Sequence, residues 1–221
     1  MSIQRRFDEE LADLKQNILR MGSLVEGQIR QALQALIDRD DDLAAQVIEN
    51  DRQVNTMDVA VDEACLGLLA LQQPAARDLR FITTAMKIST ELERMSDLAE
   101  NICERSMELN EEPQLKPYID IPLMAEHATK MVGESLDAFV RGDSVLARKV
   151  LDEDDYIDEL NEQIFRELLS FMMENPKTIS RAIRLSFISK YIERIADHAT
   201  NMAELVVYMV EGKIIRHMTS P

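Results

Sequence analysis

Two stretches that lie a hundred residues apart decide the fold. They read ELERMSDLAENICE at residues 91–104 and YIERIADHATNMAE at residues 191–204. Over the seventeen positions 88–104, eight residues recur at an offset of 100, which is more than shared helix composition explains. Apolar residues in both stretches recur every three or four positions, the spacing of one face of an α-helix. The pattern predicts an internal duplication built from helices.

The same helical spacing extends outward over most of the chain, and prolines and glycines interrupt it. Aromatic residues make up only 5% of the chain, which also favours helices over sheets. The expected helices cover residues 7–38, about 41–72, 75–108, 122–141, 144–175 and 178–211. The Pro-containing segment 109–122 is the expected linker between a first repeat, 1–108, and a second repeat, 123–221. We therefore predict an all-α protein of two tandem, similar three-helix bundles with six long helices.

The charge balance excludes some classes of function. Asp and Glu number 41 against 25 Lys and Arg, a net charge of −16, whereas a nucleic-acid binder needs a basic surface. Cys65 and Cys103 have no metal-type spacing and are expected to be small core residues in a reducing compartment. No secretory signal and no run of about 18 apolar residues is present. The expected location is the cytoplasm, including the periphery of the inner membrane where partners would hold the protein.

One repeated motif could carry chemistry. Its pattern, Glu-Arg-x-x-Asp-x-x-x-Asn, places a glutamate, an aspartate and an asparagine at i, i+4 and i+8, and so along one stripe of a helix. At about 100° per residue this stripe lies opposite the apolar face and is expected to face outward. Oxygen ligands of this kind suit hard cations such as Mg²⁺, Mn²⁺ or iron. Asp51 and Asp154, at equivalent points of the preceding helices, could each add a ligand. The candidate metal ligands are Glu93, Asp97, Asn101 and Asp51 in the first repeat, and Glu193, Asp197, Asn201 and Asp154 in the second.

Other interpretations of the stripe remain open. Arg94 and Arg194 each precede the motif aspartate by three residues and could form ordinary surface ion pairs, leaving only a solvated helix face. An acidic helical protein that stores or oxidises metal is the alternative function. Against it, His127, His198 and His217 do not lie three residues after a carboxylate, so the Glu-x-x-His pair of di-iron proteins is missing. No phosphate-binding or nucleophile-elbow motif is present either, and no catalytic residue is predicted.

Three segments resemble the PhoU family of phosphate-uptake regulators. They read MGSLVE at residues 21–26, QPAARDLR at residues 73–80, and IERIADHATN at residues 192–201; the Glu93-Arg94-x-x-Asp97 motif follows the second of these in the same helix. The resemblance extends from about residue 7 to residue 217 and includes the duplication. One departure is that Ser96 and Ala196 stand where the family often has glycine.

The resemblance implies more than the residue pattern does. It implies paired three-helix bundles with metal clusters on their outer acidic faces, held here by Glu93 and Asp97 and by Glu193 and Asp197. It also implies a non-enzymatic negative regulator of phosphate signalling, acting between the ATPase subunit of a phosphate ABC transporter and a membrane sensor histidine kinase. A homodimer is expected. The metal would be a divalent or trivalent ion such as iron, Mn, Mg or Zn.

Overall fold

A computed structural model describes residues 3–72 and 74–215, and every regular element in those ranges is a helix. The all-α prediction is therefore confirmed. Gln73 and His217, which the sequence analysis named, lie outside the described residues. No helix within them is long and apolar enough to cross a membrane. The helices are α1 (Ile3–Asp38), α2 (Asp41–Gln72), α3 (Ala76–Asn110), α4 (Asp120–Arg141), α5 (Ser144–Asp152), α6 (Asp154–Glu174) and α7 (Ile179–Glu211), with a short 3-10 turn, η1 (Pro176–Thr178).

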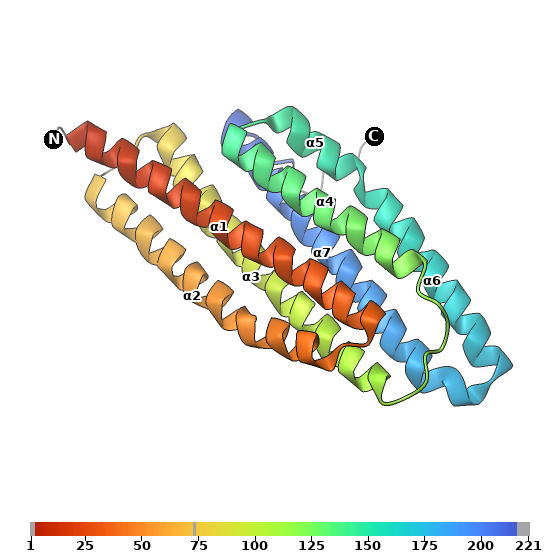
Figure 1. Ribbon diagram of the computed structural model, residues 1–221. Helices are drawn as coiled ribbons and strands as arrows, with labels where there is room; N and C mark the ends of the chain where they lie inside the picture. The colour runs from red at the N-terminus through yellow and green to blue at the C-terminus, as the bar shows by residue number, and fades with distance from the viewer. Residues whose placement is uncertain (1–2, 73, 216–221) are drawn as a thin grey trace.

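The helices form two bundles that lie side by side along their length (Figure 1). In the first bundle α1, α2 and α3 run up and down in turn, so that α2 is antiparallel to both α1 and α3, and in the second α4, the α5–α6 pair and α7 repeat this plan. Helices α3 and α7 pack against each other between the bundles, and α1 also contacts α4. The buried apolar side chains of both bundles belong to one continuous core. The two repeats are thus halves of one folded body.

The helix ends follow from local sequence. Asp40 caps α2, since its Oδ1 accepts from the Leu43 amide at 2.9 Å. Gly142 adopts φ 62° after α4, a left-handed conformation that a glycine takes without strain, and its N–H bonds back to the last turn. The side chain of Asp143 then accepts from the amides of Val145 and Leu146, each at 3.0 Å, and so starts α5. The break at Gly142-Asp143 could be predicted from the sequence, because a glycine that ends one helix is followed directly by an aspartate that caps the start of the next.

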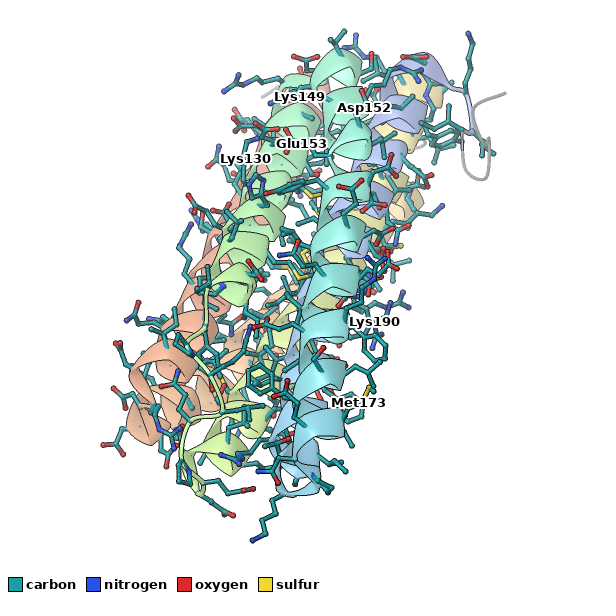
Figure 2. All side chains as sticks on the ribbon, turned by 90° about the vertical axis from the view of Figure 1, so that its right-hand side faces the viewer. Lys130, Lys149, Asp152, Glu153, Met173 and Lys190 are labelled. Atoms are coloured by element: carbon teal, nitrogen blue, oxygen red, sulfur yellow. The ribbon has the colours of Figure 1, made fainter. Side chains whose placement is uncertain are left out.

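The helix predicted over residues 144–175 is divided at Glu153. The backbone of this residue keeps helical angles, but the regular hydrogen-bond pattern stops there, so α5 ends at Asp152 and α6 begins at Asp154. Four acidic residues, 152–155, follow one another at this point. Asp is a weak helix former and neighbouring carboxylates repel one another. Lys130 of α4 donates to Glu153 at 2.8 Å and Lys149 lies 3.5 Å from it, which holds the junction in place (Figure 2).

The connection between the bundles is shorter than predicted. Helix α3 continues to Asn110 and α4 already begins at Asp120, so residues 111–119 connect them rather than 109–122. Pro122 therefore lies in the first turn of α4, where a missing N–H removes no helical bond. At the start of the connection Arg39, between α1 and α2, donates to the carbonyls of Asn110 at 2.9 Å and Glu112 at 2.6 Å. These bonds satisfy carbonyl groups at the end of α3.

Polar contacts also join the bundles. Glu91 of α3 is buried and its Oε2 lies 2.7 Å from His198 Nδ1 and 3.2 Å from Asn201 Nδ2, both on α7. Burial alone would raise the pKa of Glu91, but the hydrogen bonds and charge of His198, the hydrogen bond of Asn201 and the charge of Arg94 outweigh it and lower that pKa. At position 191, which the repeat equates with position 91, the chain has tyrosine. The contact of Glu91 with His198 and Asn201 therefore has no counterpart at position 191 in the second repeat.

Candidate metal centres

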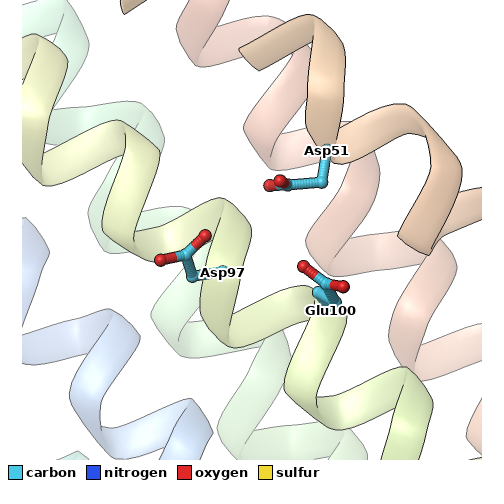
Figure 3. Close-up of side chains that lie close together, drawn as sticks. All are labelled: Asp51, Asp97 and Glu100. Atoms are coloured by element: carbon cyan, nitrogen blue, oxygen red, sulfur yellow. The ribbon is translucent and has the colours of Figure 1, made fainter. Parts of the chain in front are cut away.

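The first repeat brings three carboxylates together between α2 and α3. Asp51 comes from α2, and Asp97 and Glu100 come from successive turns of α3. One oxygen of each lies within 4.8 Å of the others, and the three side chains point toward the same space (Figure 3). Asp51 is buried, Glu100 is half-buried and Asp97 is exposed, so the cluster opens to solvent on one side. The structure thus unites the predicted residues Asp51 and Asp97 and adds Glu100.

The buried Asp51 is held by neighbouring polar groups. Ser96 Oγ, itself buried, lies 2.6 Å from Asp51 Oδ1, and Asn55 donates its amide to Asp51 Oδ2 at 2.6 Å. About two helical turns away a similar serine–aspartate contact recurs, because Ser89 donates to Asp58 at 2.7 Å. These bonds fix the orientation of the α2 carboxylates toward α3. Outer-sphere hydrogen bonds of this kind orient the ligands of metal sites.

Burial and neighbouring negative charges raise the pKa of three carboxyl groups on α3, those of Glu93, Asp97 and Glu100. Burial raises the pKa of Asp97, and the negative charge of Asp51 raises it further. Burial likewise raises the pKa of Glu93, followed by the charges of Asp97, Asp58 and Asp51. Glu100 shows the same direction, from burial and then from Asp51, Glu104 and Asp97. A cation between α2 and α3 would relieve this repulsion, and the carboxylate donor set suits a hard ion.

The second repeat also carries acidic residues between α6 and α7, although among the described residues only Asp51, Asp97 and Glu100 bring three carboxylate oxygens within 4.8 Å of one another. Burial raises the pKa of Asp154 to about 6, with further increments from the charges of Asp197, Asp158, Asp155 and Glu193. Asn161 stands at the position equivalent to Asp58 and donates to Glu193 at 3.1 Å. The charges show that Asp154, Glu193 and Asp197, all predicted ligands, share one electrostatic environment.

Three differences distinguish the second cluster from the first. Thr200 replaces Glu100, so one carboxylate is lost, and Ala196 replaces Ser96, so Asp154 has no equivalent hydroxyl beside it. Lys190 (Figure 2), at the position of Thr90, forms an ion pair with Glu193. Burial raises the pKa of Asp197, and the positive charge of Lys190 offsets part of that increase. The second cluster therefore carries less uncompensated negative charge than the first. We expect the first cluster to hold a cation more tightly.

The two asparagines of the motif take different directions. Asn101 donates its side-chain amide to the Asp97 carbonyl of its own helix at 2.6 Å. Asn201 donates to Glu91 of the other bundle, so its amide is used at the contact between the bundles. The equivalent residues Asn101 and Asn201 thus make different contacts, because position 91 is a glutamate and position 191 is a tyrosine.

The simpler interpretation of the stripe as surface ion pairs finds no support in the geometry. Within the described residues, neither Arg94 nor Arg194 forms an ion pair with the aspartate of its own motif. Both arginines are exposed, whereas Glu93 and Glu193 are half-buried. His127 packs edge-on against Tyr156, with ring centroids 4.6 Å apart, and His198 contacts Glu91. Neither histidine is placed by these contacts as a ligand of the acidic clusters.

Sequence comparison of the two repeats missed some members of the clusters. Glu100 was overlooked because Thr200 breaks the identity at that position, although Glu100 lies three residues after Asp97 on the same side of the helix. Asp58 and Asp158 were overlooked for the same reason, since they align with Asn161 and Asn55. Spacing on the helix, rather than identity between repeats, was the signal that could have found them.

The fold and these clusters define a class: duplicated all-helical proteins that display a carboxylate cluster on each half. A family model for the PhoU domain matches the chain twice, at residues 18–106 and 121–206. A PhoU homologue from Aquifex aeolicus, described as a phosphate-specific transport system accessory protein, is 44% identical over 95% of both chains. The Escherichia coli PhoU of the same description is 37% identical over 98% of this chain and 90% of its own. The chain belongs to the PhoU family, as the resemblance indicated.

Solved structures of PhoU proteins share the fold. The crystal structure of PhoU from Pseudomonas aeruginosa superposes with a TM-score of 0.90 at 43% identity, covering 94% of this chain and all of the other. The crystal structure of the phosphate transport system regulatory protein PhoU from Streptococcus pneumoniae gives a TM-score of 0.88 at 30% identity, over 94% of this chain and 98% of the other. The two-bundle arrangement is therefore a property of the family.

Proposed function

We propose that this protein is an accessory regulator of phosphate uptake that represses phosphate-starvation signalling when phosphate is plentiful. The observation that carries the proposal is full-length similarity, at 37–44% identity, to proteins named as accessory components of the phosphate-specific transport system. The regulator acts in the cytoplasm as a homodimeric adaptor. Its partners are the ATPase subunit of a phosphate ABC transporter and a membrane sensor histidine kinase. It has no catalytic role of its own and does not bind nucleic acid.

The acidic clusters are the proposed metal sites of this regulator. Asp51, Asp97 and Glu100 would hold a divalent or trivalent ion in the first repeat, with Glu93 beside them. In the second repeat Asp154, Glu193 and Asp197 would do the same. In the first repeat, support comes from the converging oxygens and from the hydrogen bonds that orient Asp51. In both repeats it comes from the repulsion between carboxylates that a cation would relieve. Iron, Mn, Mg and Zn are the candidate ions.

A deletion strain tests the regulatory proposal. Without the protein, phosphate-starvation genes should stay on in medium rich in phosphate, and a plasmid copy of the wild-type gene should restore repression. A second plasmid carrying Asp97→Asn and Asp197→Asn asks whether the clusters matter for this role; weaker repression at equal protein level is expected. Normal repression in the deletion strain would rule out the proposed function.

The alternative is a protein that stores or oxidises metal, and the number of carboxylates is the observation that favours it. Incubation with Fe(II) and oxygen separates the two functions. The regulator should bind a few ions per chain without catalytic turnover, whereas an oxidase should consume many equivalents of Fe(II).

A further inference from the structure

A basic pocket is lined by residues of α1, α3, α4 and α7, and so by both bundles. It lies at the end of the molecule where α3 begins and α4 and α7 end, and Figure 1 shows these helix ends together. Its volume is about 490 Å³, within the usual range of small-molecule sites. Arg77 and Arg80 of this pocket belong to the QPAARDLR segment at residues 73–80, to which the acidic clusters give no role. The lining of the pocket consists of Lys15, Arg77, Arg80, Phe81, Phe139, Val140, Arg141, Gly142, Met209 and Val210.

The charge of the pocket is opposite to that of the protein. Four of the lining residues are cationic and none is a carboxylate, although Asp and Glu outnumber Lys and Arg by 41 to 25 in the chain. Like charges repel when they are brought together, so such a concentration is unfavourable unless an anion compensates it. A concave site lined by one sign of charge also raises the local concentration of counter-ions.

Two of the four cations have no partner in the described part of the chain. Within the described residues, Lys15 and Arg77 make no side-chain hydrogen bond and no ion pair. Arg80 donates its Nε to the Met209 carbonyl at 3.1 Å, which fixes the guanidinium and leaves its terminal nitrogens available. Arg141 forms an ion pair of 3.0 Å with Asp137, but both side chains are more than half exposed, so this pair is weak. The pocket therefore offers positioned donors.

The dipoles of the nearby helix ends change the electrostatic field in the pocket but leave it positive. The carbonyl ends of α4 and α7 bring about −0.5 charge each, while the amide end of α3 brings about +0.5. Four full positive charges outweigh this balance. The N-cap of α3, Ala75, supplies no side-chain acceptor, so the first amides of that helix are not capped by a side chain. The field in the pocket favours an anion.

The remaining wall is apolar and aromatic. Phe81 of α3 and Phe139 of α4 stack with their ring centroids 5.3 Å apart and their planes 10° from parallel. Phe139 is buried and Phe81 is half-buried, so Phe81 can offer surface to a ligand. Because α3 and α4 belong to different bundles, a ligand in the pocket would touch both repeats.

We propose that the basic pocket binds a small anion carrying two or more phosphoryl groups. One phosphoryl group brings a charge of about −1.5 to −2 at neutral pH, which two cations would balance, whereas four cations from α1, α3 and α4 match a longer anion. Arginine forks suit the oxygen geometry of phosphoryl groups. The anion can be an inorganic polyphosphate or a nucleoside triphosphate, and only the latter would use the Phe81 surface. The proposal does not depend on the metal clusters.

Isothermal titration calorimetry of the full chain tests the proposal in buffer containing a chelator, so that metal binding does not contribute. The injected ligands are inorganic triphosphate, ATP and orthophosphate. Saturable binding of triphosphate, weakening as salt is added, is expected. Tighter binding of ATP than of triphosphate would identify the nucleotide as the source. Orthophosphate binding as tightly as triphosphate would overturn the requirement for more than one phosphoryl group.

The variant for this test is the double substitution Lys15→Gln and Arg77→Gln. Arg77 is exposed, Lys15 is half-buried, and neither has a hydrogen-bond or ion-pair partner among the described residues. The melting temperature should therefore change little, and affinity should fall by about tenfold or more. The matched control is Lys177→Gln, an exposed lysine in η1 at the opposite end of the molecule, which should bind as wild type does. Absence of saturable triphosphate and ATP binding, or equal affinity in the double variant and wild type, would overturn the proposal. Such a failure leaves the regulatory function, tested in the deletion strain, unaffected.

Discussion

Equivalent carboxylates in the two repeats differ in their surroundings, as Asp154 and Asp51 show. Asp154 has a pKa of about 6 because it is partly buried among other acids. Asp51, its counterpart, is oriented by Ser96 and Asn55. An aspartate whose folded-state pKa lies above the unfolded value near 3.8 destabilises the fold as it ionises. The second cluster therefore reduces stability at neutral pH when no cation is bound.

Asp154→Asn tests this consequence. Between pH 4 and 6 the folded wild type retains a proton at Asp154 that the unfolded chain has lost, so the free energy of unfolding falls as pH rises through this window. The asparagine variant lacks this contribution. In the presence of a chelator, its stability relative to wild type should increase from pH 4 to pH 6 and then level off. Urea unfolding at several pH values measures it.

The control for this experiment is Asp155→Asn, the exposed neighbour of Asp154. It removes the same charge from the same turn and should produce a smaller change with pH. Parallel stability curves for Asp154→Asn and wild type would show that Asp154 ionises normally in the folded protein.

The sequence predicted the central carboxylates of the clusters but not every member. Asp97 and Asp51 were found because each recurs in the other repeat. Glu100 was missed because a threonine replaces it, and Asn201 lies at an interface because Glu91 faces it. Comparison of repeats identifies what the two halves share, whereas the chemistry also depends on residues that differ.

Among the helices, local capping signals account for most boundaries. The sequence predicted the helix boundaries at Asp40, Gly142 and Asn175-Pro176, because capping residues and proline act within one helical turn. The division at Glu153 was not readable, because acidic residues also occur within continuous helices. Its cause is the run 152–155 together with the lysines that hold Glu153.

Asp143→Ala tests the capping of α5. The Asp143 side chain accepts from two backbone amides that would otherwise lack a partner in the helix. Its loss should lower the free energy of unfolding by about 0.5–2 kcal/mol, seen as a lower urea midpoint. Asp143→Asn is the matched control, since asparagine caps about as well as aspartate. Equal losses in both variants would mean that the carboxylate charge, rather than capping, is responsible.

Across the whole molecule, the side-by-side docking of the two bundles could not be derived from the sequence. The duplication predicted two similar units but not that α1 contacts α4 or that α3 contacts α7. Those contacts depend on how closely particular side chains let two helices approach. Gly22 of α1 lets α4 approach closely, because an added Cβ would clash with the Leu136 side chain, lying 3.2 Å from its Cγ.

Two glycine substitutions in α1 test the docking. Gly22→Ala should destabilise the protein, because the buried Leu136 must move and overpacking costs about 1–3 kcal/mol. Gly27→Ala meets nothing within 4 Å and should stabilise by up to about 1 kcal/mol through helix propensity. Thermal melting of the two variants compares the same substitution in the same helix. Equal melting temperatures would contradict the close approach of α1 to α4.

The most direct measurement of the central claim, that the acidic clusters bind metal, is thermal melting with and without metal. A site that binds only the folded state stabilises it by about 2.7 kcal/mol at a hundred times its dissociation constant. Each kcal/mol corresponds to roughly 2–4 °C for a chain of this size. Wild type should therefore melt several degrees higher with saturating Mg²⁺, Mn²⁺, Zn²⁺ or iron. The Asp97→Asn and Asp197→Asn double variant should lose most of that increase, even though its metal-free stability is unchanged or higher. Equal metal-induced increases in the wild type and the double variant would contradict the account.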